Sequence, residues 1–321
     1  MTASSPARDA IDAVYSSTGT QPAIASARRP LMGGTATITL VGGTEALLEA
    51  AFALAHRCEQ RWSRFLPSSD VSRLNWAQGR TVEVDPLTVR LIAAMQHGAA
   101  ITDGDYNPTV LPSVIESGYA ASAVDPDRVT ALPPSARTRA GLGEVVVSDR
   151  AVTLREGTAL DPGGIGKGLA ADVVTEFAIG EGALGAMVEI GGDVVVVGRA
   201  PDNVAWRIGV EDPFDARRHV DGVRLSRGSI VTSSQRKRRF PTPSGERHHL
   251  IDHRTGAPAT TAVQTATVIA ATGATAEALT KPAFLRRPDD YLSWLPTVGA
   301  AGLLIDADGA LHPSPNWKHY A

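Results

Sequence analysis

Four glycines fall within residues 160–168 (LDPGGIGKG) and restrict how the centre of the chain can fold. An apolar pattern of helical period follows directly, over residues 165–179. A glycine loop that opens a helix brings free backbone N–H groups close to a ligand, and Lys167 adds a positive charge. The two standard nucleotide motifs are not matched, because Asp161 interrupts the Walker pattern and Leu169 the Rossmann pattern. Taken alone, the segment predicts a phosphate site and a tight structural turn equally well.

The order of strand-like and helical stretches indicates the fold class. Alternating apolar residues predict strands at residues 35–41, 186–197, 206–210, 229–232 and 265–271, and a strand pair at 144–155. Apolar residues at helical spacing predict helices at residues 44–61, 86–100, 165–179 and 274–284. The elements are mixed without strict βαβ alternation, which favours an α+β fold over a doubly wound sheet. Residues 1–30 are rich in Ala, Ser, Thr and Pro, and we expect a mobile leader there.

Charge and composition narrow the classes of function. The formal net charge of −3 provides no general attraction to nucleic acid or to an anionic membrane. Cys58 is the only cysteine, which excludes an internal disulfide and a Cys-based zinc site. The N-terminus lacks the apolar run of a signal peptide, and no apolar stretch approaches the ~18 residues of a transmembrane helix. We therefore expect a cytoplasmic protein with neither a nucleic-acid nor a membrane partner.

Residues 102–108 (TDGDYNP) gather polar side chains that either stabilise a turn or bind a ligand. Asp103, Asp105 and Asn107 surround a glycine and Tyr106. Such residues commonly bond to their own backbone in a turn. The same side chains would otherwise offer hydrogen-bond acceptors and an aromatic face to a ligand. Calcium binding of the EF-hand type is not predicted, because no Glu follows at the required position.

A third candidate segment, residues 246–258 (ERHHLIDHRTGAP), concentrates histidines around a carboxylate. A histidine beside an aspartate can act as a general base whose tautomer is fixed by the carboxylate. Strand periodicity places His249 and Ile251 on one face and Asp252 on the other, so a direct His249–Asp252 pair does not follow from the sequence. The segment lies before a turn, which favours a functional role over an idle surface cluster. The basic run at 235–239 (QRKRR) is interpreted as a solvated face, with a phosphate contact as the alternative.

Taken together and in order, these segments resemble the ApbE-like FAD:protein FMN transferases. The matching stretches are Met32-Gly33-Gly34, residues 63–75 (SRFLPSSDVSRLN), TDGDYNP, LDPGGIGKGLAAD, EIGGD, VTSS, HHLIDHRTGAP and the helix at 276–284. The resemblance implies an α+β fold in which residues 31–321 form a single catalytic unit of two interlocked lobes, with FAD in the cleft between them. It also implies a reaction that splits FAD, attaches FMN through a phosphoester to a Ser or Thr of an acceptor protein, and releases AMP.

By position, the resemblance also implies roles for individual residues. His249 stands at the family's motif histidine and is the candidate base for the attacking hydroxyl, and Lys167 and Asp252 are the other catalytic candidates. The residues expected to line the flavin nucleotide are Met32, Phe65, Asp105, Tyr106, Asn107, Asp161, Lys167 and Ile251, with Asp193 and Thr232 nearby. The implied metal ligands are the carbonyl of Gly164 and the carboxylate of Glu277.

The sequence departs from the family at the implied magnesium site. Members usually supply an Asp and, four residues later, a Thr, whereas this chain has Glu277 and Lys281. A carboxylate of Glu can still bind Mg²⁺, but an ammonium has no acceptor lone pair. Either Mg²⁺ binds with fewer protein ligands, or Lys281 takes the place of the cation and pairs with Glu277. Coulomb repulsion favours the second hypothesis, because an ammonium ~4 Å from Mg²⁺ would repel it strongly at intermediate dielectric.

Three functions remain open from the sequence. The first is FMN transfer to a protein hydroxyl. The second is hydrolysis of FAD to FMN and AMP, with water as the nucleophile. The third is flavin binding without catalysis, in a protein that has lost its metal site. His249 and Lys167 favour catalysis, whereas Lys281 favours the degenerate protein.

Overall fold

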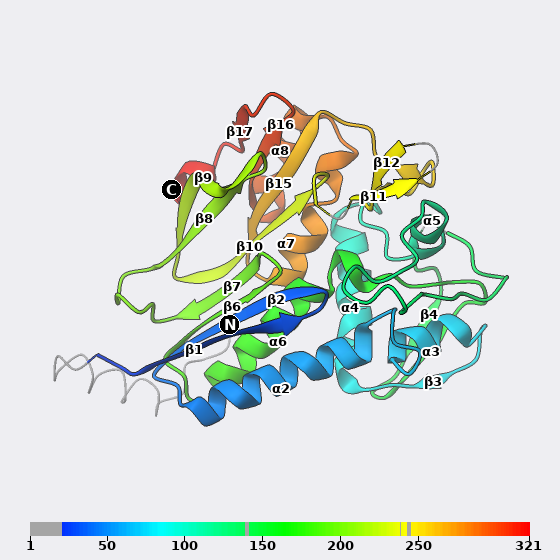
Figure 1. The fold of residues 1–321 in the computed structure, drawn as a ribbon, viewed down its shortest axis with the longest axis horizontal. Coiled ribbons are helices and arrows are strands. Elements are labelled where there is room, and N and C mark those ends of the chain that lie inside the picture. The colour runs from blue at the N-terminus through cyan, green and yellow to red at the C-terminus, as the bar shows by residue number, and fades with distance from the viewer. Residues whose placement is uncertain (1–20, 139–140, 238, 243–244) are drawn as a thin grey trace.

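The computed structural model describes residues 21–138, 141–237, 239–242 and 245–321. Its centre is an eight-stranded sheet in the order β1-β2-β6-β7-β10-β15-β16-β17 (Figure 1). All neighbouring strands in this sheet are antiparallel. The strands are β1 (Ile24–Leu31), β2 (Gly34–Val41), β6 (Gly185–Ile190), β7 (Asp193–Gly198), β10 (Arg227–Ser234), β15 (Val263–Ala270), β16 (Ala301–Asp306) and β17 (Leu311–Pro313).

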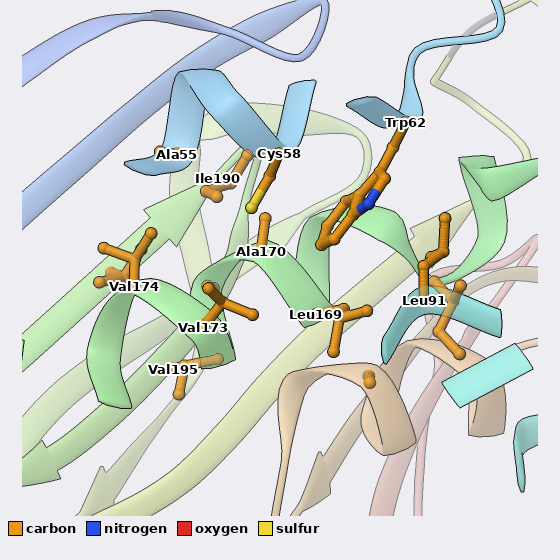
Figure 2. Close-up of a cluster of buried hydrophobic side chains, with 14 of the residues drawn as sticks. Ala55, Cys58, Trp62, Leu91, Leu169, Ala170, Val173, Val174, Ile190 and Val195 are labelled. Carbon is orange, nitrogen blue, oxygen red and sulfur yellow. The ribbon is translucent and has the colours of Figure 1, made fainter. Parts of the chain in front are cut away.

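Helices cover one face of this sheet. They are α2 (Glu45–Trp62), α6 (Gly166–Gly180) and α7 (Gly273–Leu279), with α4 (Pro86–Ile101) packed against them. Figure 2 shows Cys58 and Trp62 of α2 facing Leu169 and Val173 of α6, in the main apolar core. Burial of these side chains removes apolar surface from water, and that burial holds the helices to the sheet.

The opposite face of the sheet is covered by a hairpin of β8 (Trp206–Asp212) and β9 (Asp215–Leu225). Side chains alternate along β7, as they do in any strand, so that Val195 belongs to the helix-side core while Val194 and Val196 belong to the hairpin-side core. Trp317, in a short 3₁₀ helix (Trp317–His319), completes this second core. The sheet is therefore buried on both faces.

Smaller elements gather beyond the edge of the helical layer, at the right of Figure 1. They are α3 (Asp70–Trp76), α5 (Leu111–Glu116), the small sheet of β3 (Val82–Glu83), β5 (Ala151–Leu154) and β4 (Val145–Val147), and the hairpin of β11 (Arg239–Thr242) and β12 (Gly245–His248). The pair β13 (Ile251–Asp252) and β14 (Ala257–Pro258) follows. The helix α8 (Pro288–Trp294) packs against β16.

The α+β class and most predicted elements are confirmed. The long helices begin and end within one or two residues of prediction, and the side chain of Thr44 accepts a hydrogen bond from the backbone N–H of Leu47 at 3.1 Å, as an N-cap does. The strand predicted at 186–197, broken at Gly191-Gly192, is a hairpin of β6 and β7, and both glycines adopt positive φ at the turn between them. The helix predicted at 274–284 ends at Leu279 and continues as a 3₁₀ turn from Pro282.

The leader predicted at residues 1–30 is wrong for its last part. Residues 1–20 lie outside the described residues, but Ile24–Leu31 form β1, which pairs with β2 along its full length. Only Ala25 and Leu31 of this edge strand are buried, so it carries little apolar alternation for a sequence pattern to detect. The guanidinium of Arg29 connects the strand to α2, because it forms an ion pair with Glu49 and lies over the ring of Phe52.

Candidate active site

A cavity of about 210 Å³ brings together segments that are far apart in the sequence. Its lining includes the β1–β2 turn, the residues after α2, the loop before α5, the glycine loop, the stretch between β12 and β13, and the end of α7. Of the residues predicted for the site, Met32, Phe65, Asp105, Tyr106, Asn107, Asp161, Gly164, Lys167, His249 and Ile251 line it. Asp193, Thr232, Asp252 and Glu277 are not among its lining residues.

The glycine loop is a 3₁₀ turn, Pro162–Gly164, that leads into α6 at Gly166. Asp161 caps the turn, because its Oδ1 accepts the backbone N–H of Gly163 at 2.9 Å. None of the four glycines has a positive φ. Space for a side chain is short at Gly164 and Gly168. A Cβ at Gly164 would lie 3.0 Å from the ring of Tyr106 and 3.2 Å from Cε of Lys281.

Gly168 allows α6 and α7 to cross closely. A Cβ there would lie 2.3 Å from the carbonyl oxygen of Gly273, which real structures do not tolerate. Asp172, one turn further along α6, accepts the backbone N–H groups of Gly273 and Ala274 at 2.7 and 2.9 Å. Burial raises the pKa of the Asp172 carboxyl to about 6, against the effect of these two hydrogen bonds. This crossing fixes the start of α6 relative to α7.

A buried charge cluster lies beneath the loop and holds Lys167. Its ammonium pairs with Asp193 and lies 3.6 Å from Oε1 of Glu277. Oε2 of Glu277 accepts the backbone N–H of Gly168 at 2.8 Å. Burial raises the pKa of Glu277, and the positive charges of Lys167 and Lys281 oppose that shift. Asp193 and Glu277 do not line the cavity themselves, but they hold the side chain of Lys167, which does.

The donor set does not fit a magnesium ion. Within the described residues, no group of three or more His, Cys, Asp or Glu side chains could hold a metal. The carboxylate of Glu277 is already engaged by Gly168 and Lys167. Lys281 extends along Gly164, and its ammonium donates to the carbonyl of Glu277 at 3.0 Å. Mg²⁺ requires oxygen ligands at about 2.0–2.1 Å, whereas the side chain beside Gly164 is an ammonium that already binds the Glu277 carbonyl and offers no lone pair.

The loop before α5 contributes Asp105, Tyr106 and Asn107 in different ways. Asp105 pairs with Arg286, and Oδ1 of Asn107 accepts the backbone N–H of Thr109 at 2.9 Å. The ring of Tyr106 is buried, and its hydroxyl has no hydrogen-bond partner among the residues that the structure describes. Burial and the nearby carboxylates of Glu277 and Asp161 raise the pKa of Tyr106 well above its usual value. The segment is therefore a self-bonded turn that also forms a wall of the cavity, and ligand binding by it stays a prediction.

An aromatic wall lies opposite, beside His249. The Tyr119 ring lies edge-on to His249 at 6.4 Å between centroids and stacks on Phe240 at 5.7 Å. The Arg64 guanidinium lies 4.1 Å from the centroid of Phe65 and 4.8 Å from that of Tyr119. Sequence reasoning missed Arg64 and Tyr119, although Arg64 falls within the matched stretch 63–75. Their pairing joins residues 55 positions apart, a separation that no local pattern reports.

Two of the predicted site residues are engaged elsewhere. The carboxylate of Asp252 accepts two hydrogen bonds at 2.9 Å from the guanidinium of Arg254. This bidentate pair, two residues along the chain, engages the predicted catalytic carboxylate, and a catalytic role for Asp252 stays a prediction. The hydroxyl of Thr232, on β10, bonds to that of Thr267 on β15 at 2.8 Å.

The site thus has an electropositive end and an aromatic part. Lys167, Lys281 and the start of α6 supply positive charge and backbone N–H groups at the first. Trp62, Phe65 and Tyr119 supply flat apolar surface at the second. Such a cavity suits a ligand that carries phosphate groups and a planar ring system, with an imidazole beside it.

Comparison with known proteins gives a consistent result. The model of the ApbE family matches residues 32–303. An FAD:protein FMN transferase of Klebsiella pneumoniae is 29% identical, over 74% of this chain and 75% of the relative. One from Vibrio cholerae is 30% identical, over 70% of this chain and 69% of the relative. In the described part of the chain, no helix has the length and apolar character needed to cross a bilayer.

The fold is shared with solved structures. The crystal structure of the ApbE protein from Thermotoga maritima superposes with a TM-score of 0.80 at 26% identity, covering 93% of this chain and 99% of that one. The flavin transferase ApbE from Vibrio cholerae superposes with a TM-score of 0.76 at 22% identity, covering 94% of this chain and all of that one. The second likeness concerns the fold alone.

Proposed function

The chain belongs to the ApbE family, and from that membership we propose that it transfers FMN from FAD to a hydroxyl of an acceptor protein. Its curated relatives are named for this reaction. The observation that carries the proposal is the cavity itself, in which the electropositive loop and His249 face the same space. The acceptor is a protein, and the attacking group is a Ser or Thr hydroxyl.

The proposed reaction exchanges one phosphorus–oxygen bond for another. The acceptor oxygen bonds to the phosphorus of the FMN half of FAD, and the bond from that phosphorus to the bridging oxygen breaks. AMP leaves with the bridging oxygen. The proton of the hydroxyl passes to the imidazole of His249, which lines the cavity.

Positioning and charge neutralisation would supply most of the rate, as in other phosphoryl transfers. Lys167 is held in place by Asp193 and Glu277, so its charge is fixed before the substrate arrives. The aromatic side chains Phe65 and Tyr119 would position the ring system of the flavin nucleotide. No step is assigned to magnesium, because the residues around Gly164 do not fit that ion.

Replacing His249 tests the proposal. With a candidate acceptor, the wild-type protein should release AMP and yield a band that fluoresces on a denaturing gel. His249→Asn should lower the rate of AMP release by about 10²–10⁴-fold, the usual contribution of a general base. Its affinity for FAD, measured by flavin fluorescence, should change little, because the base acts on the acceptor.

The same assay separates the alternatives. AMP and free FMN without a fluorescent protein band would identify an FAD pyrophosphatase. Saturable FAD binding with no AMP release would identify a flavin-binding protein. An unchanged rate in His249→Asn would remove the base from the mechanism.

A further inference from the structure

The ammonium of Lys281 lies in a cradle of oxygen atoms beside the glycine loop. Nζ donates to the carbonyl of Glu277 at 3.0 Å, to Oγ1 of Thr280 at 3.0 Å and to Oγ of Ser233 at 3.2 Å. These three oxygens equal in number the protons of an ammonium. They come from the end of α7 and from β10, so two elements position the charge.

The hydroxyl protons in the cradle are arranged consistently for a cation. The Thr280 hydroxyl donates to the carbonyl of Glu277 at 2.7 Å, so its oxygen can only accept from the other two groups. The Ser233 hydroxyl, 2.7 Å from Oγ1 of Thr280, therefore donates to it and keeps a lone pair for Lys281. The two hydroxyl oxygens thus each keep a lone pair for the ammonium, while the Glu277 carbonyl is shared with the hydroxyl and the backbone N–H of Thr280.

The backbone fixes the lysine at this place. The N–H of Lys281 bonds to the carbonyl of Ala278 at 3.1 Å, and Pro282 follows immediately and ends the regular helix. The side chain then runs past Gly164, where a Cβ would come within 3.2 Å of Cε. The positive charge of Lys281 is therefore held where the end of α7 meets the glycine loop, and its side chain lines the cavity.

We propose that the Lys281 ammonium replaces a divalent cation in this cradle, so that phosphoryl transfer by this chain needs no metal. The proposal rests on the proposed function and deepens it. Lys281 and Lys167 together neutralise the pyrophosphate oxygens of FAD from two sides of the loop. An ammonium carries half the charge of a divalent ion, and Lys167, which is paired with Asp193, is the second cation at the loop.

Four proteins test the proposal: wild type, Lys281→Met, Lys281→Thr and the surface control Lys318→Met. Met keeps the length of the side chain without its charge, and Thr restores a hydroxyl in the cradle with space for an ion. Each protein is stripped of metal, and Mn²⁺ binding to its FAD complex is measured by electron paramagnetic resonance. AMP release is then measured in EDTA and in Mg²⁺. Circular dichroism checks that each variant is folded.

Wild type and Lys318→Met should release AMP at the same rate in EDTA and in Mg²⁺ and bind no Mn²⁺ in the FAD complex. Lys281→Met should be slower by about 10²-fold in both conditions, the usual loss when one charge-stabilising group is removed. Lys281→Thr should be slow in EDTA, recover in Mg²⁺ and bind Mn²⁺. Recovery by metal is a result that a purely structural role for the lysine does not produce.

Strict Mg²⁺ dependence of the wild type, full activity of Lys281→Met in EDTA, or the absence of Mn²⁺ from a folded Lys281→Thr would each overturn the proposal. If Lys281→Thr fails to fold, the wild type and Lys281→Met decide it. If none of the proteins releases AMP, the proposed function fails, but Mn²⁺ binding still decides whether the cradle holds an ammonium or a metal.

Discussion

At the scale of single residues, the hydroxyl of Tyr106 is buried in the cavity wall, and no described residue forms a hydrogen bond with it. A buried hydroxyl that makes no hydrogen bond costs about 1–3 kcal/mol. Tyr106→Phe should therefore leave the free energy of unfolding unchanged or raise it by about 1 kcal/mol. If the hydroxyl donates to bound FAD, the same change should weaken FAD binding about tenfold, which corresponds to about 1.4 kcal/mol. Urea denaturation and a fluorescence titration with FAD measure the two effects.

Tyr291→Phe is the matched control for that prediction. The hydroxyl of Tyr291 is also buried but donates to the carbonyl of Leu279 at 2.8 Å. Its loss should lower the free energy of unfolding by about 1 kcal/mol and leave FAD binding unchanged. A loss of stability in Tyr106→Phe with unaltered FAD binding would mean that the hydroxyl has a protein partner.

Most of the residues predicted for the site do line the cavity, because the matched motifs carry those residues in a fixed order. It failed where a side chain had a choice of partners. Asp252 was predicted as a catalytic group, and its carboxylate is engaged by the bidentate guanidinium of Arg254, which the sequence reasoning did not consider. Tyr119 and Arg64 escaped notice because only the folded chain brings their side chains together. For Lys281, the sequence supplied the two hypotheses and the contacts of the ammonium supply the reason to prefer one.

At the scale of elements, helices were predicted well because each buries a stripe of apolar residues that repeats with helical period. The crossing of α6 and α7 shows what such patterns omit. From the sequence, Gly168 was interpreted as part of a ligand-binding loop. In the structure, its missing side chain makes room for the backbone of Gly273. β1 was missed because only two of its residues are buried, so its sequence shows no clear apolar alternation. Its pairing with β2 is what identifies it as a strand.

Gly168→Ala should separate α6 from α7. The added Cβ would meet the Gly273 backbone at 2.3–2.4 Å, and neither helix can move without disturbing the core. We expect the free energy of unfolding to fall by about 3 kcal/mol or more, with a lower affinity for FAD because Lys167 moves. Gly180→Ala, in the same helix with no atom within 4 Å of its added Cβ, should be neutral or stabilising by up to about 1 kcal/mol. Thermal and urea unfolding measure both, and equal effects would refute the steric argument.

At the scale of the whole molecule, the cavity depends on both ends of the chain. Met32 comes from the turn after β1, while Lys281 and Leu285 come from the other side of the sheet order. The lining residues are spread from Met32 to Leu285, so no short fragment of the chain contains the site. This arrangement supports our proposal that residues 31–321 act as a single catalytic unit.

Hydrogen–deuterium exchange with and without FAD tests that dependence on the whole molecule. FAD should protect backbone amides near residues 32–33, 63–65, 105–107, 161–167 and 249–251, because each segment lines the same cavity. The β8–β9 hairpin lies across the sheet from the helices and should keep its local exchange rates. At an FAD concentration of about 100 times Kd, global unfolding should become less favourable by about 2.7 kcal/mol, which slows only the amides that exchange through it. Protection confined to the glycine loop, with residues 32–33 and 249–251 unaffected, would show that FAD does not span the cavity and that His249 lies outside the reacting complex.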